Sequence, residues 1–331
     1  LGLQRYDQFK YPVFFDLFNK QLQFFWRPEE ISLQKDRVDY QSLEEHEKHI
    51  FTSNLLFQTV MDSVVSRGVN SFSKYITSPE LEACFNVWQM FETLHSYSYT
   101  YIIKNLYPNP SDLLDQALLI PAIQERIDSV CKQYDELNNA TEDNVKAKIY
   151  LALISVNILE AVRFYVSFIC AFAFAENKKM IGNADIIKMI KRDENLHLRN
   201  TQSILSILHN NEEEGFVQTA KDYREIAIKM FVDAAEEEKA WAKYLFKDGS
   251  ILGLNSTLLS QYIEWLTDSR MSIIGLPKHF GSKNNGLGSW VIPWMESGTL
   301  QVAPQESEIT SYKISAGKSD LEEMDLSGVE L

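Results

Sequence analysis

Apolar residues recur along most of the chain at intervals of three and four, and the strict alternation expected of strands is almost absent. This pattern predicts long helices joined by short connections. The serine at position 78 precedes Pro79, Glu80 and Glu82, a typical helix start. The expected long helices cover about 42–66, 78 to the NLYPNP stretch at 105–110, 183–209, 213–247 and 255–272, with shorter helices within 111–138. A further long helix starts near Thr141 and includes the apolar segment 149–175. The predicted fold class is all-α.

The two ends of the chain differ from this helical pattern. Residues 1–40 contain Pro12 and Pro28 and predict an irregular arm packed on the helical domain, which covers residues 41–300. Residues 301–331 have few large apolar side chains and several acids, which predicts a flexible tail. Its final residues space apolar side chains among acids, as in a segment that folds into the groove of a partner. A solvated tail without a partner is the alternative.

The charge balance excludes some functions. The 331 residues include 46 Asp and Glu but 32 Lys and Arg, a net charge of −14. Nucleic-acid and anionic-membrane surfaces need basic patches, so neither partner is expected. Cys84, Cys131 and Cys170 lack metal-ligand spacing and predict free thiols in a reducing compartment, the cytoplasm. The opening LGLQRYDQFKYP lacks the basic start and apolar core of a signal peptide.

One segment is apolar enough to resemble a membrane span. Residues 149–175 are almost continuously apolar, but Glu160 and Arg163 interrupt the run midway. No uninterrupted stretch of about 18 apolar residues remains, so a buried helix within a large bundle is predicted instead. This interpretation requires a reason for a carboxylate inside that helix.

A Glu-x-x-His pair occurs twice. Glu92 and His95 form the first, and Glu194 and His197 form the second. At about 100° per residue, the two members of each pair lie within about 60° of one another on a helix. Such spacing also arises by chance on surface helices, so the residues on the neighbouring helices decide the interpretation.

Two further acids complete the pattern. Asp62 and Glu160 each occupy an otherwise apolar helix, 30 residues before Glu92 and 34 before Glu194. Ferritin-like dimetal sites combine two Glu-x-x-His pairs with one carboxylate from each of two more helices. Four ionised carboxylates balance two divalent cations, and without cations their burial would be prohibitive. We therefore predict a ferritin-like helical bundle with a dinuclear iron or manganese site, whose ligands are Asp62, Glu92, His95, Glu160, Glu194 and His197.

A tyrosine follows the first pair. Tyr99 lies four residues after His95 and returns to the ligand face of the helix within about 20°. Phe164, Phe168 and Ile190 are expected to form an apolar shell around it. Such a shell would protect an oxidised phenol from water and reductants. Periodicity alone equally allows Tyr99 to be one more core aromatic in a chain with 15 tyrosines.

Several motifs together resemble a known family. They run in order through almost the whole chain: FFWRPEE (24–30), EEHEKHIF (44–51), MDS (61–63), FETLHSYSY (91–99), NILEAVRFYVSF (157–168), RDENLH (192–197) and VAPQESEITSY (302–312). With them the chain resembles the radical-generating small subunit of class I ribonucleotide reductase, the aerobic iron-dependent type. The resemblance implies a homodimer of ferritin-like subunits with an oxo-bridged di-iron site at the six residues named above. Manganese remains possible because the ligand set tolerates both metals.

The resemblance also implies a function. Dioxygen and a reductant would assemble the cofactor, and Tyr99 would become a stable tyrosyl radical. Trp26, Asp193 and Tyr312 fall on positions that transfer the radical to the large subunit, which reduces ribonucleotides to deoxyribonucleotides. Residues 313–331 would dock that partner. Glu30 and Glu306 match acids implicated in the transfer.

Three other functions share parts of this pattern. An iron-storage protein or ferroxidase has the same fold but needs neither Tyr99 nor the tail. A dimetal oxidase or oxygenase acting on a small substrate needs an open pocket beside the metals, which the bulky Phe164 and Phe168 disfavour. A metal-free scaffold would have to bury four uncompensated acids.

Overall fold

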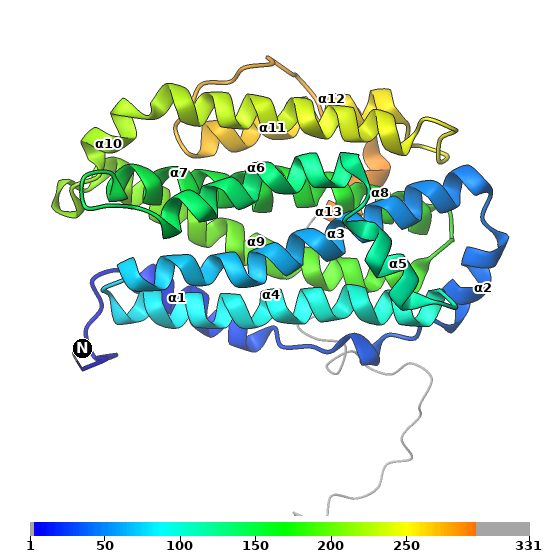
Figure 1. Cartoon of the computed structure of the whole chain (residues 1–331), viewed down its shortest axis with the longest axis horizontal. Helices are drawn as coiled ribbons and strands as arrows, with labels where there is room; N and C mark the ends of the chain where they lie inside the picture. The colour runs from blue at the N-terminus through cyan, green and yellow to red at the C-terminus, as the bar shows by residue number, and fades with distance from the viewer. Residues whose placement is uncertain (1–2, 296–331) are drawn as a thin grey trace, which may run out of the picture.

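The computed structural model describes residues 3–295, which form a helical bundle (Figure 1). Residues 1–2 and 296–331 lie outside the described part, so the predicted tail, including Glu306 and Tyr312, is not placed. Within 3–295 the structure contains no β-strand, only an isolated bridge between Ile251 and Leu254. The all-α fold class is confirmed.

The long helices lie side by side along the longest axis of the molecule (Figure 1). The helices α3 and α4 form one hairpin, and α11 and α12 form another. The helices are α1 (Pro12–Gln23), α2 (Gln34–Ser42), α3 (Glu45–Gly68), α4 (Pro79–Leu106), α5 (Pro110–Ala117), α6 (Pro121–Asn138), α7 (Val145–Ile158), α8 (Phe164–Glu176), α9 (Ile181–Asn210), α10 (Val217–Asp222), α11 (Arg224–Leu245), α12 (Ser256–Ile273) and α13 (Ile292–Met295).

Local sequence signals set several helix starts. The Ser78 hydroxyl accepts a hydrogen bond from the Leu81 amide at 3.4 Å, and α4 begins at Pro79 as predicted. Asn255 caps α12 in the same way, accepting from the Leu258 amide at 3.0 Å. These caps satisfy amides that have no partner in the first helical turn.

The longest apolar segment is the centre of the bundle. The residues Val145–Glu176 are apolar and long enough to cross a membrane, but the most apolar 18-residue window is entirely buried inside the protein. It comprises α7, a π-helical segment η3 (Leu159–Arg163) and α8. The prediction of a buried core helix is confirmed, and the π-helical interruption was not predicted.

The arm of residues 1–40 is partly helical. The helices α1 and α2 were not predicted, because Pro12 and Pro28 suggested an irregular chain. Pro12 instead occupies the first turn of α1, where proline is tolerated. Phe14 and Leu17 on α1 are buried against the bundle, at 1% and 3% exposure. Their burial stabilises a helix that is too short to form alone.

The arm is tied to the start of α9. The Asp36 carboxylate accepts hydrogen bonds from the amides of Gly182 at 2.9 Å and Asn183 at 2.6 Å. A Cβ atom on Gly182 would lie 2.6 Å from the backbone oxygen of Ser32, so only glycine permits this approach. Asp36 therefore caps a 30-residue helix from a segment about 150 positions earlier in the chain.

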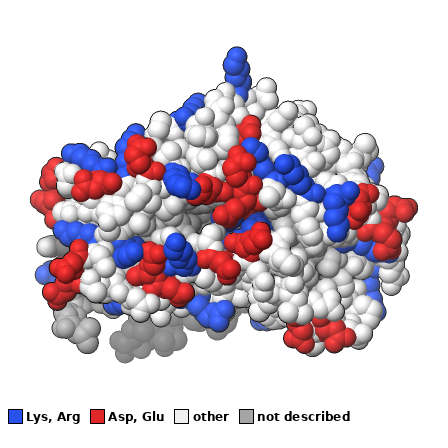
Figure 2. Space-filling view, turned by 45° about the horizontal axis from the view of Figure 1, so that its top comes forward, with Lys and Arg blue, Asp and Glu red and all other residues white. Residues whose placement is uncertain are grey.

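The surface carries mixed charge. On the face seen in Figure 2, acidic and basic side chains alternate, and no extended basic area covers that face. Some of the exposed ion pairs are within single helices, such as Lys229 with Asp233 at 2.5 Å. Pairs of this kind contribute little to stability.

Replacing Asp36 should destabilise the arm and the start of α9. We expect Asp36→Ala to lower the free energy of unfolding by about 1–2 kcal/mol, because two buried amides lose their acceptor. Chemical denaturation would measure the change, with the exposed Asp16→Ala as the matched control. Equal stability of the two variants would contradict the capping role.

Candidate metal centre

The two Glu-x-x-His pairs meet in the core. Glu92 and His95 lie on α4, and Glu194 and His197 lie on α9. One ligand atom from each of the four lies within 4.8 Å of the others, and all four residues are buried. Each imidazole contacts the carboxylate of the opposite helix. His95 Nδ1 lies 3.0 Å from Glu194 Oε1, and His197 Nδ1 lies 2.9 Å from Glu92 Oε1.

Two more carboxylates interact with this group. Asp62 on α3 and Glu160 on η3 are both 0% exposed, and none of their side-chain oxygens has a hydrogen-bond partner among the described residues. Burial raises the pKa of both, and the charges of Glu92 and Glu194 raise them further. All six predicted ligands are buried, and Asp62 and Glu160 interact electrostatically with Glu92 and Glu194. Their assignment as ligands remains a prediction.

The cluster lacks compensating cations from the protein. Among residues 3–295, no lysine or arginine forms an ion pair with Asp62, Glu92, Glu160 or Glu194. Buried carboxylates without cations are unfavourable by several kcal/mol each. Carboxylates from four helical segments with two imidazoles are the donor set of ferritin-like dimetal proteins, and it suits iron or manganese. The residues therefore fit a dinuclear metal centre.

Protons take up part of this charge when metal is absent. Burial opposes protonation of His197, but the charges of Glu92 and Glu194 outweigh it and raise its pKa to about 9. The same balance raises the pKa of His95 well above its ordinary value. Burial raises the pKa of Glu194, but its interactions with the Glu160 carboxyl group and with the two imidazoles outweigh burial and lower that pKa. Metal binding must displace such protons, because metal ligands bind in their deprotonated form.

Tyr99 is enclosed beside these acids. It is 0% exposed, and its hydroxyl has no hydrogen-bond partner among the described residues. Burial raises its pKa well above the ordinary value, followed by the charges of Asp62, Glu194 and Glu92. The phenol is therefore protonated and shielded from water. Tyr97 on the same helix is 45% exposed and donates a hydrogen bond to Glu29, so the two tyrosines occupy opposite environments.

The predicted apolar shell is buried as well. Phe164, Phe168 and Ile190 are each 0% exposed, and the two phenylalanine rings stack with centroids 6.1 Å apart. Their contact with Tyr99 remains a prediction.

A hydrogen-bonded chain runs from the cluster into the arm. The Trp26 indole N–H donates to Asp193 Oδ2 at 2.7 Å, and that oxygen lies 3.2 Å from His95 Nε2. Trp26 and Asp193 are 0% and 2% exposed. The Arg192 guanidinium donates to the other oxygen of Asp193, at 3.1 and 3.2 Å, and holds the carboxylate in place.

One neighbour of the cluster was missed by the sequence analysis. The Trp88 indole N–H donates to Glu92 Oε1 at 2.7 Å, and its ring stacks on the imidazole of His197 with centroids 5.1 Å apart. It orients both groups, as the residues surrounding metal ligands commonly do. Trp88 lies one helical turn before Glu92, and this spacing was the only indication in the sequence that it contacts the cluster. A tryptophan that only packs in the core would have the same spacing.

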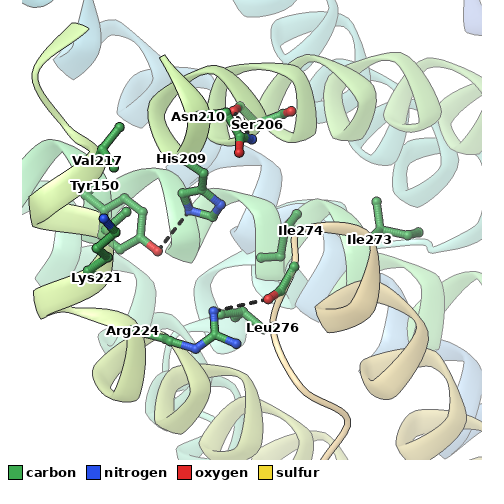
Figure 3. Close-up of a pocket in the computed structure, with 12 residues that line it drawn as sticks. Tyr150, Ser206, His209, Asn210, Val217, Lys221, Arg224, Ile273, Ile274 and Leu276 are labelled. Atoms are coloured by element: carbon green, nitrogen blue, oxygen red, sulfur yellow. Dashed lines mark hydrogen bonds between the residues drawn. The ribbon is translucent and has the colours of Figure 1, made fainter. Parts of the chain in front are cut away.

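Five recesses among residues 3–295 lie away from the predicted metal ligands. A recess of about 360 Å³ lies between α7, α9, α10, the start of α11 and the turn after α12. Figure 3 shows the residues that line it. In it, the Tyr150 hydroxyl lies 3.1 Å from His209 Nε2, and Arg224 donates to the Gly275 carbonyl at 3.1 Å. None of the five recesses described within residues 3–295 is lined by a predicted metal ligand. This enclosure argues against an oxygenase that admits a small substrate beside the metals.

A bundle of long helices around a buried group of carboxylates and imidazoles defines a ferritin-like dimetal protein. The family model described as "Ribonucleotide reductase, small chain" matches residues 4–285, and the chain belongs to this family. The resemblance found from the motifs is thus confirmed.

Individual relatives agree with the family. The chain is 46% identical to the ribonucleoside-diphosphate reductase subunit beta of Buchnera aphidicola subsp. Schizaphis graminum, over all of this chain and 94% of that protein. It is 43% identical, with the same coverage, to ribonucleoside-diphosphate reductase 1 subunit beta of Escherichia coli O157:H7. The solved R2 subunit from Clostridium botulinum has a TM-score of 0.82 at 28% identity, covering 89% of this chain and 91% of that one.

The pKa shifts predict how stability depends on pH. The folded-state pKa of His197 is about 9 and its ordinary value is 6.5, so its protonated form favours folding. That contribution is complete below about pH 6.5 and is lost as pH rises towards 9. We therefore expect the thermal midpoint of the metal-free protein to fall over this interval.

Addition of Mn²⁺ should remove most of this decline, because the metal replaces the proton. The comparison with and without Mn²⁺ also cancels any general effect of pH on the surface. A metal-free protein whose midpoint stays constant or rises between pH 6.5 and 9 would contradict the charge balance described for the cluster.

Proposed function

We propose that this chain is the radical-generating small subunit of a ribonucleoside-diphosphate reductase and that Tyr99 carries the radical. One observation supports the role of Tyr99 most directly. A fully buried phenol, with no hydrogen-bond partner in the described part of the chain, lies under the electrostatic influence of three predicted metal ligands. The partner is the large subunit, which reduces ribonucleotides to deoxyribonucleotides.

The six predicted ligands would hold two iron ions, with manganese also tolerated by the donor set. When bound, the iron pair supplies, with dioxygen and a reductant, the oxidising power for a one-electron oxidation of Tyr99. Loss of an electron from a phenol also releases its proton. Asp62 exerts the strongest charge effect on Tyr99 among the neighbouring acids, so we assign it as the acceptor of that proton. Burial then shields the oxidised ring from water.

The oxidising equivalent would leave along the chain from His95 through Asp193 to Trp26. Its hydrogen bonds of 3.2 and 2.7 Å support this path. Tyr312 and Glu306 would continue it in the tail, which lies outside the described residues, and Glu30 would assist. Residues 313–331 would dock the large subunit. We further propose a homodimer located in the cytoplasm.

Replacing Tyr99 tests the radical assignment. We expect Tyr99→Phe to bind two metal ions as before but to lose the organic radical signal in electron paramagnetic resonance, because phenylalanine cannot be oxidised at that potential. Tyr97→Phe on the exposed side of the same helix is the matched control and should keep the signal. A radical that persists in Tyr99→Phe would exclude this residue, and a ferroxidase without a radical would show no signal in any variant.

Replacing Trp26 tests the transfer path. Trp26→Phe should form the Tyr99 radical normally but yield no deoxyribonucleotide with the large subunit, because the hydrogen bond to Asp193 and the oxidisable indole are both lost. Trp265→Phe on α12, outside this chain of hydrogen bonds, should retain turnover. Radical yield by resonance and product formation by chromatography separate the two steps, and full turnover in Trp26→Phe would refute the path.

A further inference from the structure

The segment that carries Glu160 is unusual within its helix. Residues Leu159–Arg163 form a π-helical turn inside the continuous helical stretch Val145–Glu176. Turns of this kind are rare in proteins, and those that occur are often found at functional sites. A π-helical turn also changes the direction of the side chains it carries relative to an uninterrupted α-helix. Something must therefore hold this turn in place if Glu160 is to face the cluster.

The other end of the same turn is fixed by buried charges. The Arg163 guanidinium, 3% exposed, donates from Nη1 to Glu238 Oε1 at 3.0 Å and from Nη2 to Glu237 Oε2 at 2.6 Å. Its Nη2 also donates to the Ser129 hydroxyl at 3.0 Å. One side chain of η3 is thus bonded to both α11 and α6. Glu160, three residues earlier, is 0% exposed and interacts electrostatically with Glu92 on α4 and Glu194 on α9.

A second arginine also pairs with Glu238, whereas the bonds of Arg163 to Glu237 and Ser129 do not involve it. Arg126 on α6 donates from Nε at 2.9 Å and from Nη2 at 2.6 Å to Glu238 Oε1. Its guanidinium also lies 3.2 Å from the ring centroid of Phe57 and 4.5 Å from that of Trp241. Arg126 and Glu238 are 2% and 0% exposed. Two arginines and two glutamates form a network with balanced charge, which buried ions require.

The structure thereby gives η3 a support that the metal cluster does not supply. Arg270 on α12 adds a further link, donating from Nε to the Ala161 carbonyl at 3.4 Å. Buried ion pairs contribute little net stability compared with apolar residues of similar size, but they impose defined geometry. A network of this kind is suited to fixing orientation.

We propose that Arg163, held by Glu238 and Glu237, is a positioning residue that orients the π-helical turn and thereby aims Glu160 at the metal centre. This inference rests on the proposed metal-binding function. Arg163 touches neither metal nor substrate and acts only through the backbone of η3. Loss of the Arg163 side chain should therefore alter metal binding while the protein still folds.

The substitution Arg163→Met separates these effects. Glu238 keeps its pair with Arg126, and Glu237, whose side chain is 34% exposed, borders a surface recess of about 300 Å³ and can be solvated. No buried charge is left unpaired. The matched control is Arg126→Met, which removes an equally buried arginine from the same network but leaves the bond between Arg163 and Glu238. Arg163→Lys retains the charge with fewer donors.

Binding of Mn²⁺ to the metal-free full chain is the first measurement, and the visible absorption of the Co²⁺-loaded protein, which reports coordination geometry, is the second. We expect Arg163→Met to weaken binding of one of the two Mn²⁺ ions roughly 10- to 100-fold and to alter the Co²⁺ bands. Arg126→Met should lower the thermal midpoint but retain both the affinity and the bands. Arg163→Lys should fall between the unchanged protein and Arg163→Met.

Three outcomes would overturn the inference. Unchanged affinity and bands in Arg163→Met would remove the positioning role. Equal weakening in Arg126→Met would assign the effect to general stability. Circular dichroism will show whether Arg163→Met folds. If it does not, unchanged Mn²⁺ binding in Arg163→Lys would remove the positioning role. An unaltered protein that fails to bind two ions would instead refute the metal centre itself.

Discussion

The burial of several acids at one point in the core is the constraint on which this structure depends. Asp62, Glu92, Glu160 and Glu194 are all 0% exposed, and no lysine or arginine in the described part of the chain neutralises them. Without metal, the charges of Glu92 and Glu194 raise the pKa of His197 to about 9, so this imidazole holds a proton. The same electrostatic imbalance that makes the empty cluster unfavourable makes it a strong site for two divalent ions.

The rest of the bundle controls access to this centre and its connections. Tyr99 is fully buried, and the five recesses described among residues 3–295 are lined by other residues. One hydrogen-bonded route leads outward, through Asp193 to Trp26 in the arm. The proposed generation of an oxidant for use elsewhere would need both isolation of the centre and a route of this kind. An iron-storage protein needs neither feature, although it shares the fold.

Much of the site could be predicted from the sequence, because the spacing of two residues along a helix determines the angle between their side chains. Residues three positions apart lie on nearly the same face of a helix, so the Glu and the His of each Glu-x-x-His pair were expected to share a face. Asp62 and Glu160 stood out as acids in apolar helices. The helices α1 and α2 were missed, since their prolines resemble breaks and their stability depends on contacts with the bundle. Trp88 was missed because a core aromatic and a ligand-orienting one have the same pattern.

By itself, the sequence determined the helical fold class, the limits of most long helices and the residues able to form a dimetal site, because these follow from local periodicity and from the energetic cost of burying charge. Only the tertiary structure decided that residues 159–163 form a π-helical turn and that Arg163 pairs with Glu238, 75 positions away. It also decided that Asp36 caps α9 from 146 positions earlier. These features depend on contacts between distant segments, and no local pattern in the chain specifies which distant side chain will complete them.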